Sequence, residues 1–117
     1  MKNKSHVCRI INEDTVGRVR DAMPGDDGSF LDLAHFFKSF GDPTRLKILS
    51  ALSKAPLCVC DIAALIGAQH SAVSHQLAGL VRAHLIRQRK EGKLVYYSLA
   101  DRHVEVLLAT GFEHLNE

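Results

Sequence analysis

The sequence lacks any long apolar run. A membrane-spanning helix needs roughly 20 consecutive apolar residues, and no segment of the 117 residues approaches that length. The chain begins Met1-Lys2-Asn3-Lys4 with no apolar stretch behind it, which argues against a secretory signal peptide. These two absences favour a cytoplasmic protein over a membrane or secreted one.

Cysteine is also scarce. The chain has three, Cys8, Cys58 and Cys60, and the last two are separated by a single residue. An odd number at this spacing is a poor disulfide framework. It suits a cluster of thiolates in a reducing compartment.

The chain has little net charge, only +2. Phosphate binding needs local basic density rather than a high total. Five basic residues lie within twelve positions: Arg82, Arg87, Arg89, Lys90 and Lys93. A solvated charged face is the commoner reason for such a run, so its place in the fold has to decide its role.

What is present is the composition of a globular protein, with 46% hydrophobic and 24% charged residues. The length indicates one domain. Residues 1–28 are polar and end in the turn-rich stretch Met23-Pro24-Gly25-Asp26-Asp27-Gly28. We therefore predict a mobile N-terminal arm over 1–28, with a short helix over 13–23, and a compact domain over 29–117.

Apolar periodicity predicts four helices in the first part of that domain. Ser29 and Asp32 resemble a capping box for a helix that Gly41 ends. Asp42-Pro43 is a good start for the next helix, a short helix over 58–66 ends at Gly67, and another covers 70–83. In the helix over 70–83 one side is apolar and carries Val73, Leu77, Leu80 and Val81, and His84 just after it falls on the same side.

The pattern then changes to that of a hairpin. Residues 86–90 and 94–99 are strand-like around the turn Glu91-Gly92, and a final helix runs from about 101 to the end. Helix, turn, helix and basic hairpin in this order predict a mainly α fold with a small β-hairpin, a winged helix-turn-helix. Its recognition helix would offer Ser71, Ser74, His75 and Gln76 to the major groove. Its wing would hold phosphates through Arg87, Arg89, Lys90 and Lys93.

Three stretches resemble the ArsR/SmtB family of metal-responsive repressors, nearest its cadmium/lead and zinc sensors. They are Leu57-Cys58-Val59-Cys60-Asp61-Ile62-Ala63, Ser71-Ala72-Val73-Ser74-His75-Gln76-Leu77 and Gly92-Lys93-Leu94-Val95-Tyr96-Tyr97-Ser98-Leu99. The resemblance implies a homodimer, joined through its terminal helices, that binds operator DNA and releases it when metal binds. Three positions depart from the family. Gln69 stands where the family often has a Ser or Thr that caps the recognition helix, and Ala63 stands where the arsenite sensors have a further cysteine. Asn12 stands where some cadmium/lead sensors have a second N-terminal cysteine.

Four residues of the last helix form a candidate metal site: Asp101, His103, His114 and Glu117. The two histidines lie three turns apart on one face, about 16 Å along the axis, so one chain cannot bring both to one ion. Two antiparallel copies about a two-fold axis would make two sites, each with two imidazoles and two carboxylates, suited to Zn²⁺. The four positions match the interfacial site of the family. Solubility alone also explains such residues on a surface helix.

The cysteines form a second candidate site. Cys58 and Cys60 can reach one ion only near a helix start or in extended chain, and the helix N-terminus favours thiolate. Cys8 on the arm would be the third sulfur, from the partner protomer if the family arrangement holds, and Asp61 or His6 could be a fourth ligand. Such a site selects Cd²⁺ or Pb²⁺. Alternatively, Cys58 and Cys60 are buried small hydrophobes.

Two other functions remain open at this point. The same scaffold could sense oxidants through Cys8, Cys58 or Cys60, and a metal-binding protein without DNA function would leave the helix-turn-helix unexplained. An enzyme is disfavoured, because the terminal site would use four protein ligands and leave no open position for water, and no nucleophile–base pair is apparent.

Overall fold

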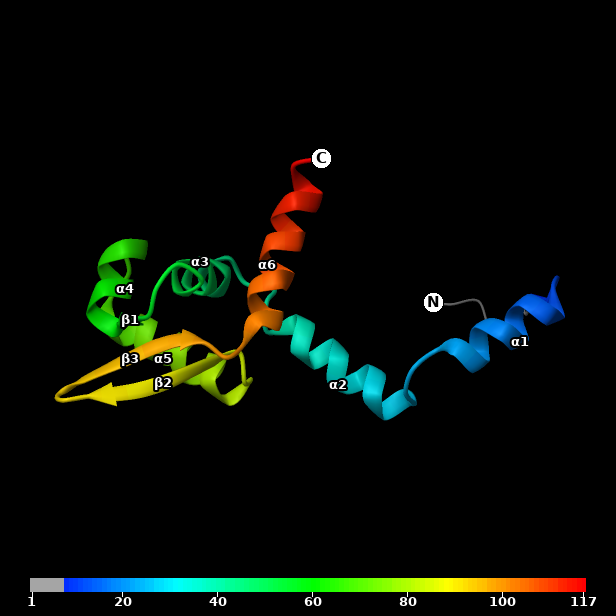
Figure 1. Ribbon diagram of the computed structural model, residues 1–117, viewed down its shortest axis with the longest axis horizontal. Coiled ribbons are helices and arrows are strands. Elements are labelled where there is room, and N and C mark those ends of the chain that lie inside the picture. Colours follow the sequence, from blue (N-terminus) through cyan, green and yellow to red (C-terminus); the bar gives the residue numbers. More distant parts are fainter. Residues whose placement is uncertain (1–7) are drawn as a thin grey trace. The chain divides into compact units, whose positions relative to one another are not determined.

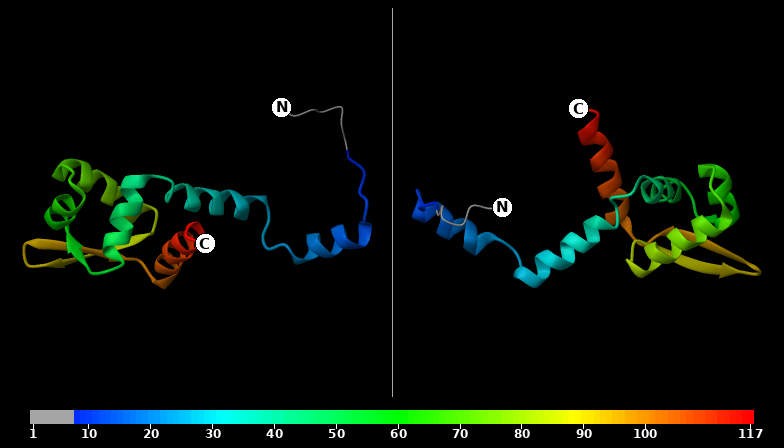
Figure 2. Two further views of the ribbon diagram at one scale, coloured as in Figure 1. Left: turned by 90° about the horizontal axis from the view of Figure 1, so that it is seen from above. Right: turned by 180° about the vertical axis from the view of Figure 1, so that it is seen from behind.

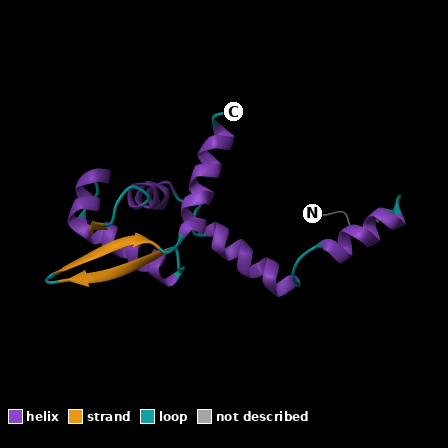
Figure 3. Ribbon diagram, viewed as in Figure 1, coloured by secondary structure: helices purple, strands orange, loops and turns teal. Residues whose placement is uncertain are grey.

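The computed structural model describes residues 8–117, and most of them are helical (Figures 1 and 3). The elements in chain order are α1 (Glu13–Ala22), α2 (Asp27–Lys38), α3 (Pro43–Leu52), β1 (Leu57–Cys58), α4 (Val59–Ile66), α5 (His70–Arg82), β2 (Ile86–Glu91), β3 (Leu94–Leu99) and α6 (Arg102–Leu115). No helix in this range is long and apolar enough to cross a membrane. The mainly α fold with a basic hairpin is confirmed.

The chain forms two compact units, divided between Asp32 and Leu33. The first unit contains α1, whose bounds confirm the helix predicted over 13–23. The Asn12 side chain accepts a hydrogen bond from the Thr15 N–H at 2.9 Å and caps this helix. The division of the chain into an arm over 1–28 and a domain over 29–117 stays a prediction.

The predicted capping box at Ser29 is wrong. The capping residue is Asp26, three residues earlier, and α2 begins at Asp27; the Asp26 carboxylate accepts a hydrogen bond from the Ser29 N–H at 2.9 Å. The backbone and side chain of Ser29 both donate to this carboxylate and hold the pKa of Asp26 below its ordinary value. An aspartate at this position is as good a cap as serine, so the local sequence offers two equivalent starting points for the helix.

α3 begins at the predicted signal and α4 ends at the predicted glycine, although α4 begins at Val59, one residue later than predicted. The Asp42 carboxylate accepts a hydrogen bond from the Arg45 N–H at 2.9 Å, and Pro43 is the first residue of α3. α4 ends at Gly67, whose φ of 70° is in the left-handed region that glycine adopts without steric cost. α4 and α5 then form the helix-turn-helix, since only Gly67, Ala68 and Gln69 join them.

The sheet has three antiparallel strands in the order β1-β3-β2. β2 and β3 form the predicted hairpin, with Ile86 opposite Leu99 and Glu91 opposite Leu94. Sequence reasoning missed β1, which pairs Leu57 with Tyr97 and Cys58 with Tyr96. The tip of the hairpin extends beyond α4 and α5 in each view (Figures 1 and 2), so this wing is free to reach a ligand.

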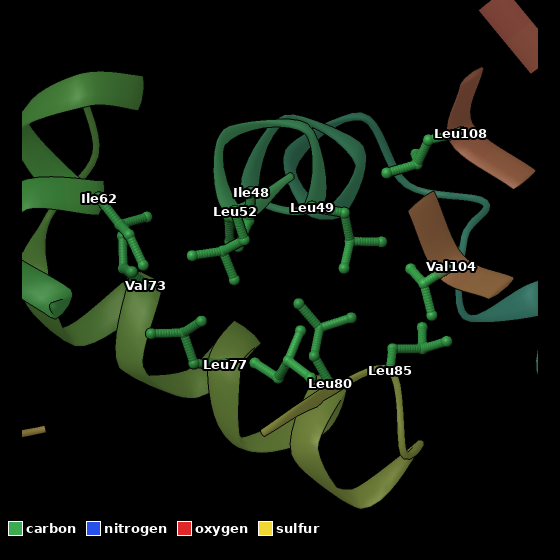
Figure 4. Close-up of a cluster of buried hydrophobic side chains, with 11 residues drawn as sticks. Ile48, Leu49, Leu52, Ile62, Val73, Leu77, Leu80, Leu85, Val104 and Leu108 are labelled. Atoms are coloured by element: carbon green, nitrogen blue, oxygen red, sulfur yellow. The ribbon is translucent and has the colours of Figure 1, made fainter. Parts of the chain in front are cut away.

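One apolar core holds the second unit together. Side chains from α3, α4, α5 and α6 point toward one another in it (Figure 4), and Ile48, Leu49, Ile62, Leu77 and Leu80 are completely buried. Each fully buried side chain of this kind contributes about 1.5–3 kcal/mol to stability. The core therefore fixes α5 and the start of the hairpin, through Leu85 and Ile86, on one scaffold.

Candidate nucleic-acid interface and metal ligands

The polar face of α5 is open to solvent. Ser71 and His75 are exposed, and Ser74 beside them is half-buried, while Val73, Leu77 and Leu80 on the opposite side are buried. Ala78 and Arg82 continue the polar face toward the end of the helix. The burial pattern therefore agrees with the predicted recognition face for Ser71, Ser74 and His75.

Gln76 is in a different environment. Its Oε1 accepts a hydrogen bond from Nε of Arg45 in α3 at 2.8 Å, and this contact is partly buried. The amide is therefore engaged with a neighbouring helix. Sequence reasoning did not single out Arg45, because nothing in the local pattern of α3 shows which residue of α5 will lie opposite it.

The start of α5 lacks a side-chain cap. Gln69 has the extended backbone of an N-cap residue, with φ of −74° and ψ of 148°, but its side chain makes no capping hydrogen bond. The missing cap is consistent with the residue type, since glutamine is not among the preferred N-cap residues. The N–H groups at the start of the helix are consequently available to an anion.

The wing carries four basic side chains that are all exposed: Arg87, Arg89, Lys90 and Lys93. Its turn needs a glycine, because Gly92 has a φ of 63°. Arg89 forms an ion pair with Glu91 at 2.7 Å, and both side chains are more than half exposed. Exposed pairs of this kind contribute little, so Arg89 can exchange Glu91 for a phosphate.

Cys58 and Cys60 lie at the start of α4, as predicted. Cys58 is the N-cap residue with extended backbone and also the last residue of β1, and Cys60 is the second residue of the helix. Cys60 and the neighbouring Asp61 are exposed, whereas Cys58 is only 8% exposed. Cys58 is thus one of the buried hydrophobic side chains, as the alternative interpretation of a small hydrophobe expects for it, whereas the thiol of Cys60 is open to solvent.

Cys8 is exposed in the first unit, and His6 lies outside the described residues. Within residues 8–117 of one chain, no three His, Cys, Asp or Glu side chains are grouped closely enough to hold a metal ion. The two sites predicted from the sequence therefore need ligands brought together from both units or from two chains.

The terminal helix presents its four candidate ligands to solvent. Asp101 is the N-cap of α6, and its Oδ1 accepts a hydrogen bond from the His103 N–H at 2.9 Å and lies 3.3 Å from Nδ1 of the same residue. Desolvation raises the pKa of Asp101, but hydrogen bonds from the N–H groups of His103 and Val104 and from the His103 side chain outweigh it and lower the pKa. The carboxylate is thus charged at neutral pH, as a metal ligand must be.

His114 is in the last turn of α6 and Glu117 follows the helix, and both are exposed. The helix between Asp101 and Asn116 is continuous, so His103 and His114 keep the axial separation of about 16 Å expected from 1.5 Å per residue. In one chain the four ligands therefore form two separate pairs.

Comparison with known proteins identifies the family of this chain. Residues 42–88, which include the helix-turn-helix, match the model of the bacterial regulatory protein family named arsR. The chain is 42% identical over 114 residues to a cadmium resistance transcriptional regulatory protein CadC homolog of Staphylococcus aureus, covering 95% of this chain and 93% of that one.

A transcriptional repressor SmtB homolog of Synechocystis is 48% identical over 85 residues, which are 73% of this chain and 64% of that one. Among solved structures, the homodimeric winged helix-turn-helix domain of a possible ArsR-family regulator from Mycobacterium bovis superimposes with a TM-score of 0.71. It is 28% identical and covers 82% of this chain and 91% of that one. The chain belongs to the ArsR family of bacterial regulatory proteins.

Proposed function

We propose that this protein is a metal-responsive transcriptional repressor in the cytoplasm. As a homodimer it binds operator DNA through α5 and the wing, and it releases the DNA when Cd²⁺, Pb²⁺ or Zn²⁺ binds. The observation that carries the proposal is the exposed polar face of α5 beside a wing with four exposed basic side chains. Relatives named as a cadmium resistance regulator and an SmtB-type repressor support the metal response.

The exposed apolar side chains of α6 support a dimer. Val106, Phe112 and Leu115 of α6 are 48%, 53% and 79% exposed. Val106 is on the side of the helix opposite the buried Val104 and Leu108, whereas Phe112 and Leu115 continue the buried side toward the end of the helix. Phe112 and Leu115 also border an apolar hollow of about 360 Å³ with Phe40, Leu46 and Leu107. Covering such residues with a second copy would remove them from water. An antiparallel copy would then bring Asp101 and His103 to the partner's His114 and Glu117.

The donor chemistry of both candidate sites fits the metals proposed. Cys58 and Cys60, with Cys8 and with Asp61 as a further oxygen ligand, form a sulfur-rich set suited to Cd²⁺ or Pb²⁺, and the Asp/His/His/Glu set suits Zn²⁺. A metal ion at the thiolate site would hold the start of α4 to Cys8, and a metal ion at the terminal site would hold α6 to the α6 of a second copy. Because α4 packs directly on α5, a change at Cys58 and Cys60 has a short route to the recognition helix.

The test is a binding assay on operator DNA. A duplex selected by the protein from a random-sequence pool is labelled, and binding is followed by fluorescence anisotropy during titration with Zn²⁺, Cd²⁺, Pb²⁺ and hydrogen peroxide. We expect at least one metal to lower the affinity by about 5–150-fold, the range of a typical allosteric coupling. Release by peroxide alone would favour the redox sensor, and failure to select any duplex would favour a metal-binding protein without DNA function.

A further inference from the structure

Two guanidinium groups approach the same point beside α5. A Cβ added at Gly79 would lie 2.9 Å from Nη2 of Arg45 and 3.8 Å from Nη2 of Arg82. The absence of a side chain at Gly79 is therefore what lets Arg45 of α3 extend over the recognition helix. Arg82 belongs to the polar face that also carries Ser71 and His75.

The position of Arg45 is held from two sides. Its Nε donates to Oε1 of Gln76 at 2.8 Å, and its backbone N–H donates to the Asp42 carboxylate at 2.9 Å. The Nε–H group can only donate, so the amide atom that faces it is the oxygen. Gln76 thereby fixes the guanidinium without neutralising it.

Neither guanidinium group has a carboxylate partner in the described part of the chain. The ion pairs there are Arg89 with Glu91 and His103 with Asp101. A hollow of about 380 Å³ adjoins Arg45 and is lined by His35, Lys38, Ser39, Asp42, Arg45 and Gln76. Its one carboxylate, Asp42, already caps α3. Two like charges held close together repel each other, and an anion bound between them would attract both and outweigh that repulsion.

We propose that Arg45 and Arg82 together bind one phosphate of the DNA backbone, beside the recognition helix and apart from the wing. In this arrangement Gln76 is a positioning residue for Arg45 rather than a reader of a base. Adenine recognition by glutamine uses both the amide oxygen and the amide nitrogen, and the oxygen of Gln76 is taken by Arg45. The proposal rests on the proposed function, since it requires that the protein binds DNA.

The test measures how the affinity for the selected duplex depends on salt in Arg82→Gln, Arg45→Gln and Gln76→Leu. A dimer of Arg82→Gln would weaken its hold on two phosphates, so the slope of log K against log salt should become shallower by up to about 1.8, at about 0.9 per phosphate lost. The affinity for a random duplex should fall in parallel. Arg45→Gln should make the slope shallower in the same way. Gln76→Leu should also make the slope shallower, without changing the preference for any base pair.

Lys47→Gln is the matched control. Lys47 is a cation on α3, but it borders a different hollow, with Leu65 and Phe112, so its slope should equal that of the natural protein. Unchanged slopes in Arg82→Gln and Arg45→Gln would overturn the proposal, as would an altered preference at one base pair in Gln76→Leu with the slope intact. Arg82 is at the end of α5 and outside the apolar core, so its variant remains informative if Arg45→Gln fails to fold. Failure of the natural protein to bind any duplex would instead overturn the proposed function.

Discussion

His84 adopts a left-handed backbone conformation, with φ of 61°, directly after α5. The N–H of His84 donates to the Val81 carbonyl and the N–H of Leu85 to the Leu80 carbonyl, each at 3.0 Å, which is the Schellman pattern that glycine usually ends. Leu80 and Leu85 are both fully buried. Periodicity places His84 on the apolar side of the helix, but the chain turns there and leaves it outside the core.

His84→Gly should therefore stabilise the protein. A non-glycine residue in this conformation costs about 1–2 kcal/mol. Glycine removes that cost, but it also raises the conformational entropy of the unfolded chain, which offsets part of the stabilisation. We therefore expect the free energy of unfolding to increase by about 0.5–1 kcal/mol and Tm to rise by a few degrees. Ala83→Gly is the control, because Ala83 has a φ of −81° and should only lose stability. Thermal melts at one protein concentration check both, and equal losses in both variants would contradict the assignment of strain.

The thiolate site makes a prediction about single cysteines. Thiols bind Cd²⁺ as thiolates, so protons compete with the metal and Cd²⁺ affinity should fall as the pH is lowered. Cys60, exposed at the start of α4, is more open to an ion than the buried Cys58. Cys60→Ser should remove most of the ultraviolet sulfur-to-Cd²⁺ charge-transfer band and the Cd²⁺-driven release of DNA.

Cys8→Ser is the more discriminating change, because it asks whether the first unit contributes a ligand. A weaker band and a weaker operator response to Cd²⁺ and Pb²⁺ are expected. If both stay as in the natural protein, the three-sulfur site does not exist, and the Asp101/His103/His114/Glu117 set becomes the better candidate for the sensor, with Zn²⁺ as its effector.

At the scale of elements, the proposed function gives the hairpin and α5 different roles in DNA binding. The tip of the wing carries exposed charge, since Lys90 and Lys93 flank Glu91-Gly92 and all four residues are exposed. α5 offers hydroxyl and imidazole groups from Ser71, Ser74 and His75, which can contact base edges. Affinity common to all sequences should therefore depend on the wing, and sequence preference on α5.

Lys90→Ala with Lys93→Ala should weaken binding to every duplex by a similar factor. The salt slope should become shallower by up to about 0.9 for each phosphate that the wing no longer binds, measured by anisotropy on selected and random duplexes. Ser71→Ala is the matched contrast on α5 and should change the preference among sequences more than the slope. A wing variant that alters recognition of one base pair while the slope stays intact would contradict this division.

At the scale of the whole molecule, α6 leaves several large apolar side chains exposed in a single chain. In the proposed dimer, a second copy would cover its exposed apolar residues and bring its two separated pairs of candidate ligands together. A dimer would also set the spacing of the two recognition helices, which must match about one turn of DNA. Metal that ties the two copies of α6 together could disfavour that spacing, and the coupling needs only about 1–3 kcal/mol.

Mixing a His103→Ala protein with a His114→Ala protein tests this arrangement. In the heterodimer one interfacial site lacks both histidines and the other is complete, so high-affinity Zn²⁺ or Co²⁺ binding should return in part. Subunit exchange is verified beforehand by energy transfer between labelled protomers. A mixture with confirmed exchange that binds no better than either parent would exclude the intersubunit site.

Local patterns in the sequence were enough to determine most elements of this protein. The signals for helix ends and turns influence only the backbone within a few residues of them; they are Asp42-Pro43, Gly67 and Glu91-Gly92. The apolar spacing of Val73, Leu77 and Leu80 determines which side of α5 is buried. Each of the three family motifs is likewise a single continuous stretch of sequence. These features were predictable because each depends on backbone geometry and on neighbours three or four positions away.

Interactions between segments distant in the sequence were decided only by the tertiary structure. They are the pairing of β1 with β3, the hydrogen bond from Arg45 to Gln76, and the meeting of Arg45 and Arg82 beside Gly79. Periodicity indicates that a face is buried but not what covers it. α3 and α5 share one apolar core, to which Leu49, Leu77 and Leu80 belong, and Arg45 of α3 reaches Gln76 of the recognition helix. That position follows from side-chain shape in the core rather than from any local signal.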